Sequence, residues 1–530
     1  MSRKALHLKI AVAVILGCVS TSAALRADVT LHAIFRDDMV LQREMSVPVW
    51  GTADAGEVVT VKLNGQRVAG AAGAKGEWMV KLAPMKAGGP FEMTVAGKNT
   101  VKITNVLVGD VWLCGGQSNM AMSVGASMNS KEEIAAADYP KIRLFRVANT
   151  KADQPQKDLR GRWLVCTPRT VSGFTAVGYF FGRKLHKDLD VPIGLIHSNW
   201  GGTPAEAWTG IQALEADPAF APLLERWQKV IENYPAAKAK YDNMLAEWRK
   251  AAETARAEGK RPPRRPPRPR GPDSASRPAV LYNAMIHPLT PFAIKGAIWY
   301  QGEANAGRAE EYRKLLPAMI GNWRTAWGQG DFPFLIVQLA NFMAVSSQPT
   351  DTGWARLREA QHLTARTLPN CGLAVIIDTG EARDIHPKNK QDVGKRLALV
   401  ALARVYGKRI VYSGPEYESM RVEGARVRLR FKHTGSGLAV RTSEMPNYPN
   451  MTKEGYGFTL GDAPVKGFAI AGDDRNFVWA HAKIDGETVL VWSDAVAKPV
   501  AVRYAWANNP VCNLYNREGL PAVPFRTDDW

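Results

Sequence analysis

Ser118 has the setting of a catalytic nucleophile. It follows the glycines Gly115 and Gly116, which end a β-branched apolar stretch over residues 106–112. This order predicts a buried strand, a glycine turn and a serine at the mouth of the next element. Such a serine attacks an ester when a histidine takes its proton. A serine that only caps a helix fits the same spacing equally well.

An acid and a histidine stand together far downstream of this serine. Asp384 precedes His386 by two residues, after a predicted strand over 374–378 and before a helix that begins near Gln391. His386 is therefore expected on a loop at the carboxyl end of a strand. A capping or solvated histidine is the alternative, but the acid, the histidine and Ser118 share one predicted sheet edge. Together they predict a serine esterase.

Acyl transfer also needs hydrogen-bond donors aimed at the developing oxyanion, and two turns can supply them. The first contains Gly201 and Gly202 and follows an apolar stretch over 193–198. A glycine there lets a backbone N–H approach a ligand closely. The second follows 296–300 and contains Gln301, whose side chain carries an amide. Either turn alone can be structural, whereas four blocks on one edge favour a catalytic site.

Strands that alternate with helices are expected to position these blocks. The alternation predicts a parallel sheet with helices on both faces between residues 105 and 412. Short strands between glycine turns predict β-sandwich domains over 28–104 and 413–530, with a hairpin at Asn64-Gly65. In the central region, buried strands are predicted over 106–113, 193–198, 296–300, 334–338 and 374–378, and helices over 175–188 and 312–327.

Residues 211–280 look inserted into this alternation. Apolar residues at helical spacing over 223–231 and again over 241–248 predict a helical hairpin, followed by the Pro-Arg run 260–270. That run is typical of an extended, solvated segment, although it can also contact an acidic polymer or an anionic envelope surface. A spacer is the favoured interpretation of the insertion, with a lid or a partner surface as alternatives. Because the run supplies much of the net charge of +19, the charge does not indicate nucleic-acid binding.

Residues 1–27 have the features of a secretory signal peptide. Arg3 and Lys4 precede a short apolar core over 10–19, and small residues follow. The mature protein is therefore expected to be secreted or periplasmic, with no membrane span. The cysteines beyond this leader are widely spaced, which allows one disulfide or buried free thiols and indicates no metal site. They are Cys114, Cys166, Cys371 and Cys512.

Four sequence blocks together resemble the sialate O-acetylesterase family of SGNH (GDSL-like) hydrolases. The resemblance covers essentially the whole mature chain. It implies an α/β fold with a flavodoxin-like three-layer α/β/α catalytic domain over 105–412, flanked by the two β-sandwich domains. The blocks are Gly116-Gln117-Ser118-Asn119-Met120, Trp200-Gly201-Gly202-Thr203, Gln301-Gly302-Glu303-Ala304-Asn305 and Asp384-Ile385-His386-Pro387.

The resemblance also implies a role for each site residue. Ser118 is implied as the nucleophile, His386 as the general base and Asp384 as the acid that orients His386. The oxyanion hole is implied to consist of Ser118, Gly202 and Gln301, and neither a metal nor a cofactor is needed. Many SGNH enzymes place the acid three residues before the histidine, where this chain has Arg383. Asp378, Glu303 or a dyad without an acid therefore stay open as alternatives to Asp384.

The expected substrate is an O-acetylated carbohydrate, either a sialic acid or a polysaccharide such as acetylated xylan or xyloglucan. The residues expected to contact it are Gln117, Asn119, Trp200 and Glu303. Sialate recognition requires a partner for the carboxylate, and the arginines near the blocks are Arg183, Arg308 and Arg383. A non-catalytic carbohydrate-binding surface protein and a lipase- or thioesterase-like enzyme are the alternatives. The oligomeric state cannot be inferred from the sequence.

Overall fold

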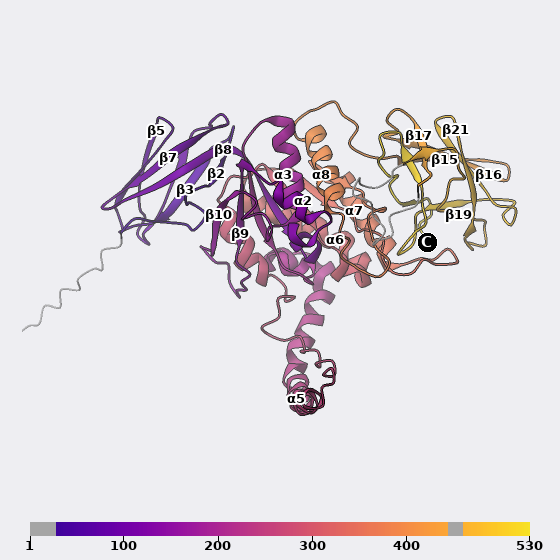
Figure 1. Cartoon of the computed structure of the whole chain (residues 1–530), viewed down its shortest axis with the longest axis horizontal. Helices are drawn as coiled ribbons and strands as arrows, with labels where there is room; N and C mark the ends of the chain where they lie inside the picture. The colour runs from indigo at the N-terminus through magenta and orange to yellow at the C-terminus, as the bar shows by residue number, and fades with distance from the viewer. Residues whose placement is uncertain (1–27, 444–458) are drawn as a thin grey trace, which may run out of the picture.

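A computed structural model describes residues 28–443 and 459–530 of the chain. Figure 1 shows a central α/β region between two β regions, with one long helix projecting from the middle. The predicted leader over residues 1–27 lies outside the described residues. Within the described part of the chain, no helix has both the length and the apolar character needed to cross a membrane.

The central region is built on a mainly parallel sheet, which confirms the predicted α/β fold. Its strands run in the order β10-β9-β11-β8-β12-β13-β14, and only β10 pairs antiparallel to its neighbour. Strands β11, β12 and β13 are buried along their whole length, as in a sheet covered on both faces. The strands are β8 Thr100–Gly116, β9 Tyr139–Val147, β10 Gly161–Cys166, β11 Ile193–Asn199, β12 Gly296–Tyr300, β13 Phe334–Val337 and β14 Cys371–Ala374.

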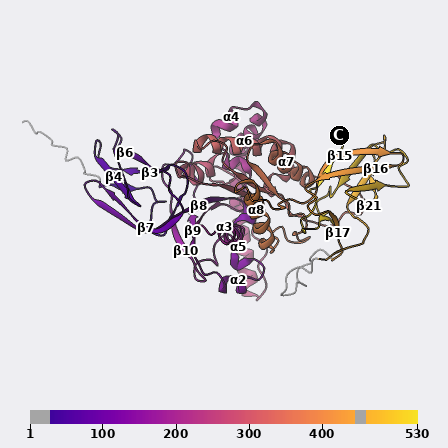
Figure 2. The same ribbon diagram turned by 90° about the horizontal axis from the view of Figure 1, so that it is seen from above.

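Helices cover both faces of this sheet. Helices α3 (Ala176–Leu189) and α8 (Lys390–Arg404) pack against each other on one face, and α6 (Ala309–Trp327) and α7 (Gly353–Thr367) pack together on the other. Figure 2 shows α6 and α7 together on one side of the central region and α3 on the other. The short helices are α1 Ser118–Ala121, α2 Ser130–Ala135, α4 Ile211–Glu215, η1 Val124–Ala126, η2 Ala205–Trp208, η3 Pro218–Phe220, η4 Tyr282–Ile286, η5 His287–Leu289 and η6 Glu303–Arg308.

Strand β8 belongs to two regions at once. Its first half pairs with β7 of the N-terminal β region, and residues 110–116 pair with β11 and β12 of the central sheet. Because of this, the apolar cores of the N-terminal and central regions are continuous. Asn64 and Gly65 both have positive φ and join β4 to β5, as the hairpin prediction requires. The strands are β1 Thr30–Leu31, β2 Val40–Gln42, β3 Val47–Thr52, β4 Val58–Leu63, β5 Gln66–Ala71, β6 Glu77–Leu82 and β7 Gly88–Ala96.

The C-terminal β region has a core of its own. The strand predicted over 374–378 is displaced, because the last central strand is β14 over 371–374. Beyond it, Val375 and Ile377 leave the sheet and pack into the C-terminal core. An apolar run cannot distinguish these two kinds of burial. The strands are β15 Glu416–Glu423, β16 Arg426–Lys432, β17 Leu438–Arg441, β18 Leu460–Gly461, β19 Phe468–Ala471, β20 Val478–Trp479, β21 His481–Asp485, β22 Thr488–Trp492, β23 Ala501–Tyr504, β24 Leu514–Asn516 and β25 Phe525–Arg526.

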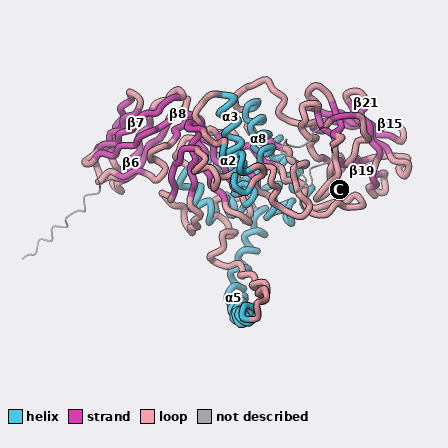
Figure 3. The backbone as a smooth tube through the Cα atoms, in the orientation of Figure 1, coloured by secondary structure: helices cyan, strands magenta, loops and turns pink. Residues whose placement is uncertain are grey.

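The predicted helical hairpin is instead one continuous helix, α5, over Ala221–Ala257. Its 37 residues span about 55 Å, and it projects from the body in Figures 1 and 3. Pro235 lies inside this helix without ending it. The Pro-Arg run returns along the helix: the Trp248 indole donates to the Pro263 carbonyl oxygen at 2.8 Å, and Arg265 lies over the indole ring. We call α5 and the returning run 258–271 the arm.

The four cysteines within the described residues are all buried and unbridged. Their predicted alternative, one disulfide, is therefore not formed among them. Burial raises the pKa of Cys371 to about 11, so this thiol is kept protonated and unreactive at neutral pH.

Candidate active site

Three neighbouring strands end at the same level of the central sheet. In the register, Gly116 at the end of β8 lies between Asn199 of β11 and Tyr300 of β12. The residues that follow each strand therefore emerge side by side at one edge. This brings together Ser118, the turn at 200–202 and Gln301, as the sequence predicted.

The turn before Ser118 requires glycine. Gly116 has φ of +140°, and a Cβ on it would lie 2.1 Å from the Tyr300 carbonyl oxygen. A side chain there would clash with backbone, so the strand can turn sharply only at glycine. Gln117 N–H then donates to the same Tyr300 oxygen at 3.0 Å, and Ser118 begins the short helix α1. The turn leaves Ser118 partly exposed at the carboxyl end of the sheet.

The glycine turn after β11 packs against this serine. A Cβ on Gly201 would lie 3.4 Å from the Cβ of Ser118, and Trp200 N–H donates to the Gly116 carbonyl oxygen at 3.2 Å. Gly202 has φ of +73° and is exposed, with open space around its missing side chain. The backbone of this turn is thus accessible beside the nucleophile, as an oxyanion donor must be. Trp200 itself is half-buried.

Gln301 lies at the same edge but its side chain is turned inward. It is fully buried, and its Nε2 donates to Asn305 Oδ1 at 2.7 Å and to the Thr203 carbonyl oxygen at 3.3 Å. The Tyr312 hydroxyl donates to Oε1 at 3.0 Å. Both amide hydrogens therefore have protein acceptors. This arrangement does not support the expected role of Gln301 as the third oxyanion donor, and it makes the residue a brace between two turns.

Asp384 contacts His386 through a tight local turn. Its Oδ1 accepts from His386 N–H at 2.9 Å and lies 3.5 Å from the Nδ1 atom of the same histidine. A carboxylate that accepts from the backbone two residues on is a common turn, which explains how the short spacing can work. Partial burial acts to raise the pKa of Asp384, but Lys388 at 2.8 Å and the His386 N–H hold it below its ordinary value.

The two alternative acids are engaged elsewhere. Asp378 forms a buried bidentate pair with Arg396, at 2.5 and 2.8 Å, and accepts from the Tyr515 hydroxyl at 2.9 Å. Glu303 accepts from Asn119 at 2.6 Å. Asp384 is thus the carboxylate whose geometry suits His386.

The serine and the histidine are brought together indirectly. No direct hydrogen bond joins Ser118 to His386 among the described residues, but Asn119 Nδ2 donates to the Ile385 carbonyl oxygen at 2.9 Å. The residue after the nucleophile therefore contacts the residue before the histidine. Hydrogen bonds between catalytic groups are often long in a ligand-free site and tighten when substrate binds.

Three residues expected to contact substrate are instead part of the interior. Gln117 and Asn119 are buried, and the Gln117 side chain accepts from the N–H groups of Gly302 and Ala304 at 3.4 and 3.3 Å. Glu303 is buried at its carboxylate, where Oε2 has no hydrogen-bond partner. These side chains hold the turns together. Trp200, the fourth expected contact, is half-buried.

One buried charge at this edge has no signal in the sequence blocks. Lys390 is fully buried at the start of α8, and its Nζ donates to Asn119 Oδ1 at 2.6 Å. Burial lowers the pKa of Lys390 to about 7, against the opposing charge of Glu303. Burial likewise raises the pKa of Glu303, against the hydrogen bond from Asn119 and the charge of Lys390. In the sequence Lys390 looks like one of several solvated charges after His386.

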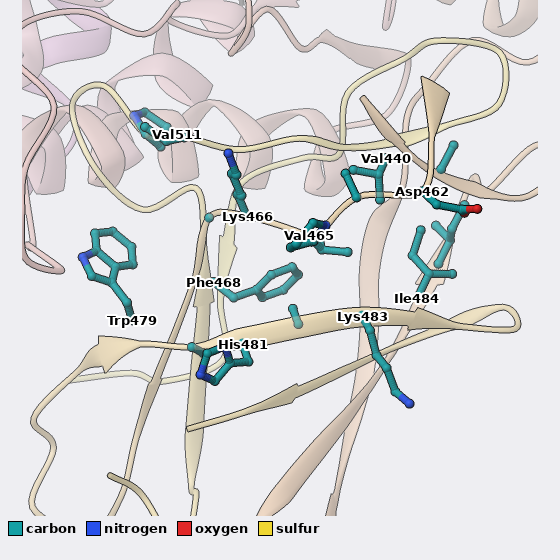
Figure 4. Close-up of a pocket in the computed structure, with 18 of the residues that line it drawn as sticks. Val440, Asp462, Val465, Lys466, Phe468, Trp479, His481, Lys483, Ile484 and Val511 are labelled. Carbon is teal, nitrogen blue, oxygen red and sulfur yellow. The ribbon is translucent and has the colours of Figure 1, made fainter. Parts of the chain in front are cut away.

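A cavity of about 1270 Å³ lies in the C-terminal β region, between its sheets and the loop at Val345 (Figure 4). Trp479, His481 and Phe468 line it, and none of the predicted site residues does. It is therefore not the acyl site. Among the described residues, no group of three His, Cys, Asp or Glu side chains is arranged to hold a metal ion.

Comparison with known proteins shows the family. A sequence-family model described as "Carbohydrate esterase, sialic acid-specific acetylesterase" matches residues 108–259 and 274–403. This chain is also similar to proteins named sialate O-acetylesterase. The rat protein is 34% identical over 92% of each chain. The human protein is 32% identical over 92% of this chain and 90% of its own.

A solved structure agrees with these sequence matches. The crystal structure of a carbohydrate acetylesterase from Xanthomonas citri is 39% identical, with a TM-score of 0.78 over 95% of this chain and 100% of that one. The sequence resemblance is thus confirmed over nearly the whole length, including both β regions. The chain belongs to the sialic acid-specific acetylesterase family of carbohydrate esterases.

Proposed function

We propose that this protein removes O-acetyl groups from carbohydrates through a serine acyl-enzyme. The observation that carries the proposal is the common end of β8, β11 and β12, which sets Ser118 beside an accessible glycine turn. A supporting observation is the position of the loop that carries Asp384 and His386, which Asn119 holds to the serine turn. Family membership and the names of the similar proteins support acetyl esters of sugars as the substrate class.

The mechanism follows from the roles of these groups. Ser118 attacks the acetyl carbonyl carbon while His386 takes the serine proton, and Asp384 steadies the resulting imidazolium. The sugar hydroxyl leaves with that proton, and water then hydrolyses the acetyl-enzyme by the same steps in reverse. The backbone N–H groups of Ser118 and of Gly202 or Gly201 stabilise the oxyanion. Because the Gln301 amide is occupied, two donors rather than three carry this role.

The choice of sugar depends on which charges are free at the rim. Arg183 pairs with Glu133, and Arg308 pairs with Glu206 and Glu311. Arg383 is exposed beside the acid and forms no ion pair within the described residues. Of the three candidate arginines, Arg383 is thus the one free to receive the carboxylate of a sialic acid.

Acetate release from a panel of O-acetylated glycans tests the proposal. The panel holds O-acetylated sialic acids, acetylated xylan and acetylated xyloglucan, and compares the purified protein with Ser118→Ala. We expect release to fall by about 10⁴-fold or more in Ser118→Ala while the variant stays folded. Undiminished release from a folded Ser118→Ala protein would exclude the serine mechanism.

The pattern across the panel identifies the substrate. Release from sialic acids alone, reduced by Arg383→Ala but not by Arg383→Lys, indicates sialate recognition through a positive charge. Release from a plant polysaccharide alone indicates a polysaccharide deacetylase. Release of longer acyl groups from aryl esters, in preference to acetate, indicates the lipase- or thioesterase-like alternative. Binding without any serine-dependent release indicates the carbohydrate-binding alternative.

We also infer that the protein is exported, to the periplasm or beyond. The inference rests on the charged and apolar segments of residues 1–27. Determination of the N-terminal residue of the mature protein, expected near residue 25 or 28, tests it.

A further inference from the structure

Asn119 connects four separate segments of the catalytic region. Its Nδ2 donates to Glu303 Oε1 at 2.6 Å and to the Ile385 carbonyl oxygen at 2.9 Å, while its Oδ1 accepts from Lys390 Nζ at 2.6 Å. The orientation of this amide is unambiguous, because a lysine can only donate and a carbonyl can only accept. One side chain thus joins the serine helix α1, the turn after β12, the histidine loop and the start of α8.

The two charged partners of Asn119 are placed at considerable energetic cost. Lys390 is fully buried, and it stands at the first residue of α8, where the helix dipole disfavours a positive charge. Its Nζ also lies 5.2 Å from the centre of the Tyr300 ring. A simple packing role would be served better by an apolar residue of the same size. What distinguishes these charged side chains from apolar ones is that they form hydrogen bonds with Asn119.

We propose that Lys390 and Glu303 are positioning residues which, by fixing the Asn119 side chain from both sides, hold the His386 loop at the distance that Ser118 requires. The proposal rests on the serine mechanism proposed above. Asn119 links the serine turn to the histidine loop directly. It follows Ser118 in the chain, and its side chain donates to the backbone one residue before His386. Without its two partners the amide can rotate, and the histidine loop loses its contact with the serine turn.

We call Asn119 with its partners Lys390 and Glu303 the bridge. The bridge also introduces a pH dependence that does not belong to the serine and histidine themselves. Burial lowers the pKa of Lys390 to about 7, and the charged groups facing it are Glu303, Glu381, Asp384 and the like-charged Lys388. Below that pH the ammonium donates a charge-assisted hydrogen bond to Asn119, and above it the neutral amine donates a weaker one. The turnover number of the wild-type protein should therefore decline as the pH rises through about 7, where the ammonium form is lost.

Two substitutions of similar volume test the bridge. Lys390→Met and Glu303→Gln should each lower kcat on an aryl acetate by about 10- to 100-fold with little change in KM, because the substrate contacts are untouched. The decline in kcat near neutral pH should disappear in Lys390→Met. The double variant should lose less than the product of the single losses, since the two residues act through one amide. The rate at which a fluorophosphonate labels Ser118 should fall in parallel.

Arg324→Met is the matched control. Arg324 is also buried in the catalytic region, but it donates to the carbonyl oxygens of Phe332 and Pro369, before the starts of β13 and β14. The Arg324→Met variant should have a lower melting temperature, with kcat and its pH profile unchanged. Wild-type kcat, pH profile and labelling rate in folded Lys390→Met would overturn the proposal, as would equal losses in Arg324→Met.

The remaining outcomes are also decisive. If Lys390→Met does not fold, Glu303→Gln decides alone, because glutamine keeps the volume but removes the carboxylate charge that strengthens the hydrogen bond from Asn119. If the wild-type protein shows no serine-dependent hydrolysis of any acetate ester, the proposed function fails while the labelling rate of Ser118 still tests the bridge. Hydrolysis that depends on Ser118 but not on Lys390 or Glu303 overturns the bridge and leaves the function intact.

Discussion

The catalytic edge and the arm are both rich in charge, yet they use it in opposite ways. Lys390 is fully buried and bonded to Asn119, whereas Arg261, Arg264 and Arg270 of the arm are exposed and form no ion pair within the described residues. A buried charge is costly unless its partners are in place, so it restricts their positions. An exposed charge is solvated and restricts little. The number of charges in a region therefore says less than how many of them are removed from water.

In the comparison of the two regions, the largest expected effect concerns the acid at the catalytic edge. Asp384→Asn should lower kcat by about 10²- to 10⁴-fold, because the imidazolium loses its partner. Since Lys388 holds the pKa of Asp384 below its ordinary value, the carboxylate keeps its charge into mild acid and loses it only as the pH falls through that lowered pKa. Steady-state kinetics with an aryl acetate measure the effect. Asp378→Asn is the comparison and should lower thermal stability instead, because it breaks the buried pair with Arg396.

Removal of the outer part of the arm should have a much smaller effect on catalysis. Gly271 lies against the Tyr234 ring, so residues 237–268 can be replaced by a short glycine-serine linker between neighbouring ends. We expect kcat/KM on an aryl acetate to stay within about twofold, since the buried contacts of α5 with the body lie at its base near Leu223. A loss comparable to that of Asp384→Asn would show that the arm takes part in catalysis.

The same excision should change how the protein binds to charged surfaces. The excised segment holds ten Lys and Arg residues against four Asp and Glu. Retention on a cation exchanger should therefore decrease, and the salt concentration needed for elution should fall. Unchanged retention would mean that the charge of the body, not of the arm, dominates binding to anionic surfaces.

The smallest expected effect is local to the arm. Trp248→Ala removes the hydrogen bond to Pro263 and the ring beneath Arg265, which together contribute about 1–2 kcal/mol to the attachment of the Pro-Arg run. Trypsin should then cut after Arg264 or Arg270, which no proline follows, roughly tenfold faster. Activity should not change. Tyr241→Phe, which removes only a hydroxyl near Arg265, is the milder control; equal cleavage of wild type and Trp248→Ala would show that the run is not held by the indole.

Elements with a local signature could be predicted from the sequence. The strands over 193–198 and 296–300 appear within one residue of their predicted ends, because glycine and polar turns bound each apolar run. The displaced strand at 374–378 shows the limit, since its apolar residues serve two cores. The arm shows another: two separate apolar clusters predicted a helical hairpin, but α5 runs without a break between them.

The site was predictable in its parts and not in its connections. The edge shared by Ser118, the glycine turn and Gln301 follows from strand register, which alternating strands and helices imply. Which way the Gln301 amide points, and what Asn119 contacts, depends on partners up to 271 residues away in the chain. Lys390 looks like a solvated charge in the sequence because burial is decided by the packing of α8 against the body, which no local pattern records.

Because of strand β8, the N-terminal region and the active site are expected to evolve as one unit. It enters as an edge partner of β7, and it ends two residues before Ser118 without a break between the two sheets. Any boundary drawn between the two regions would fall within β8. Exchange of either region for a foreign domain would therefore disrupt a strand that both regions use. The N-terminal β region and the turn that carries Ser118 thus share one strand and one apolar core.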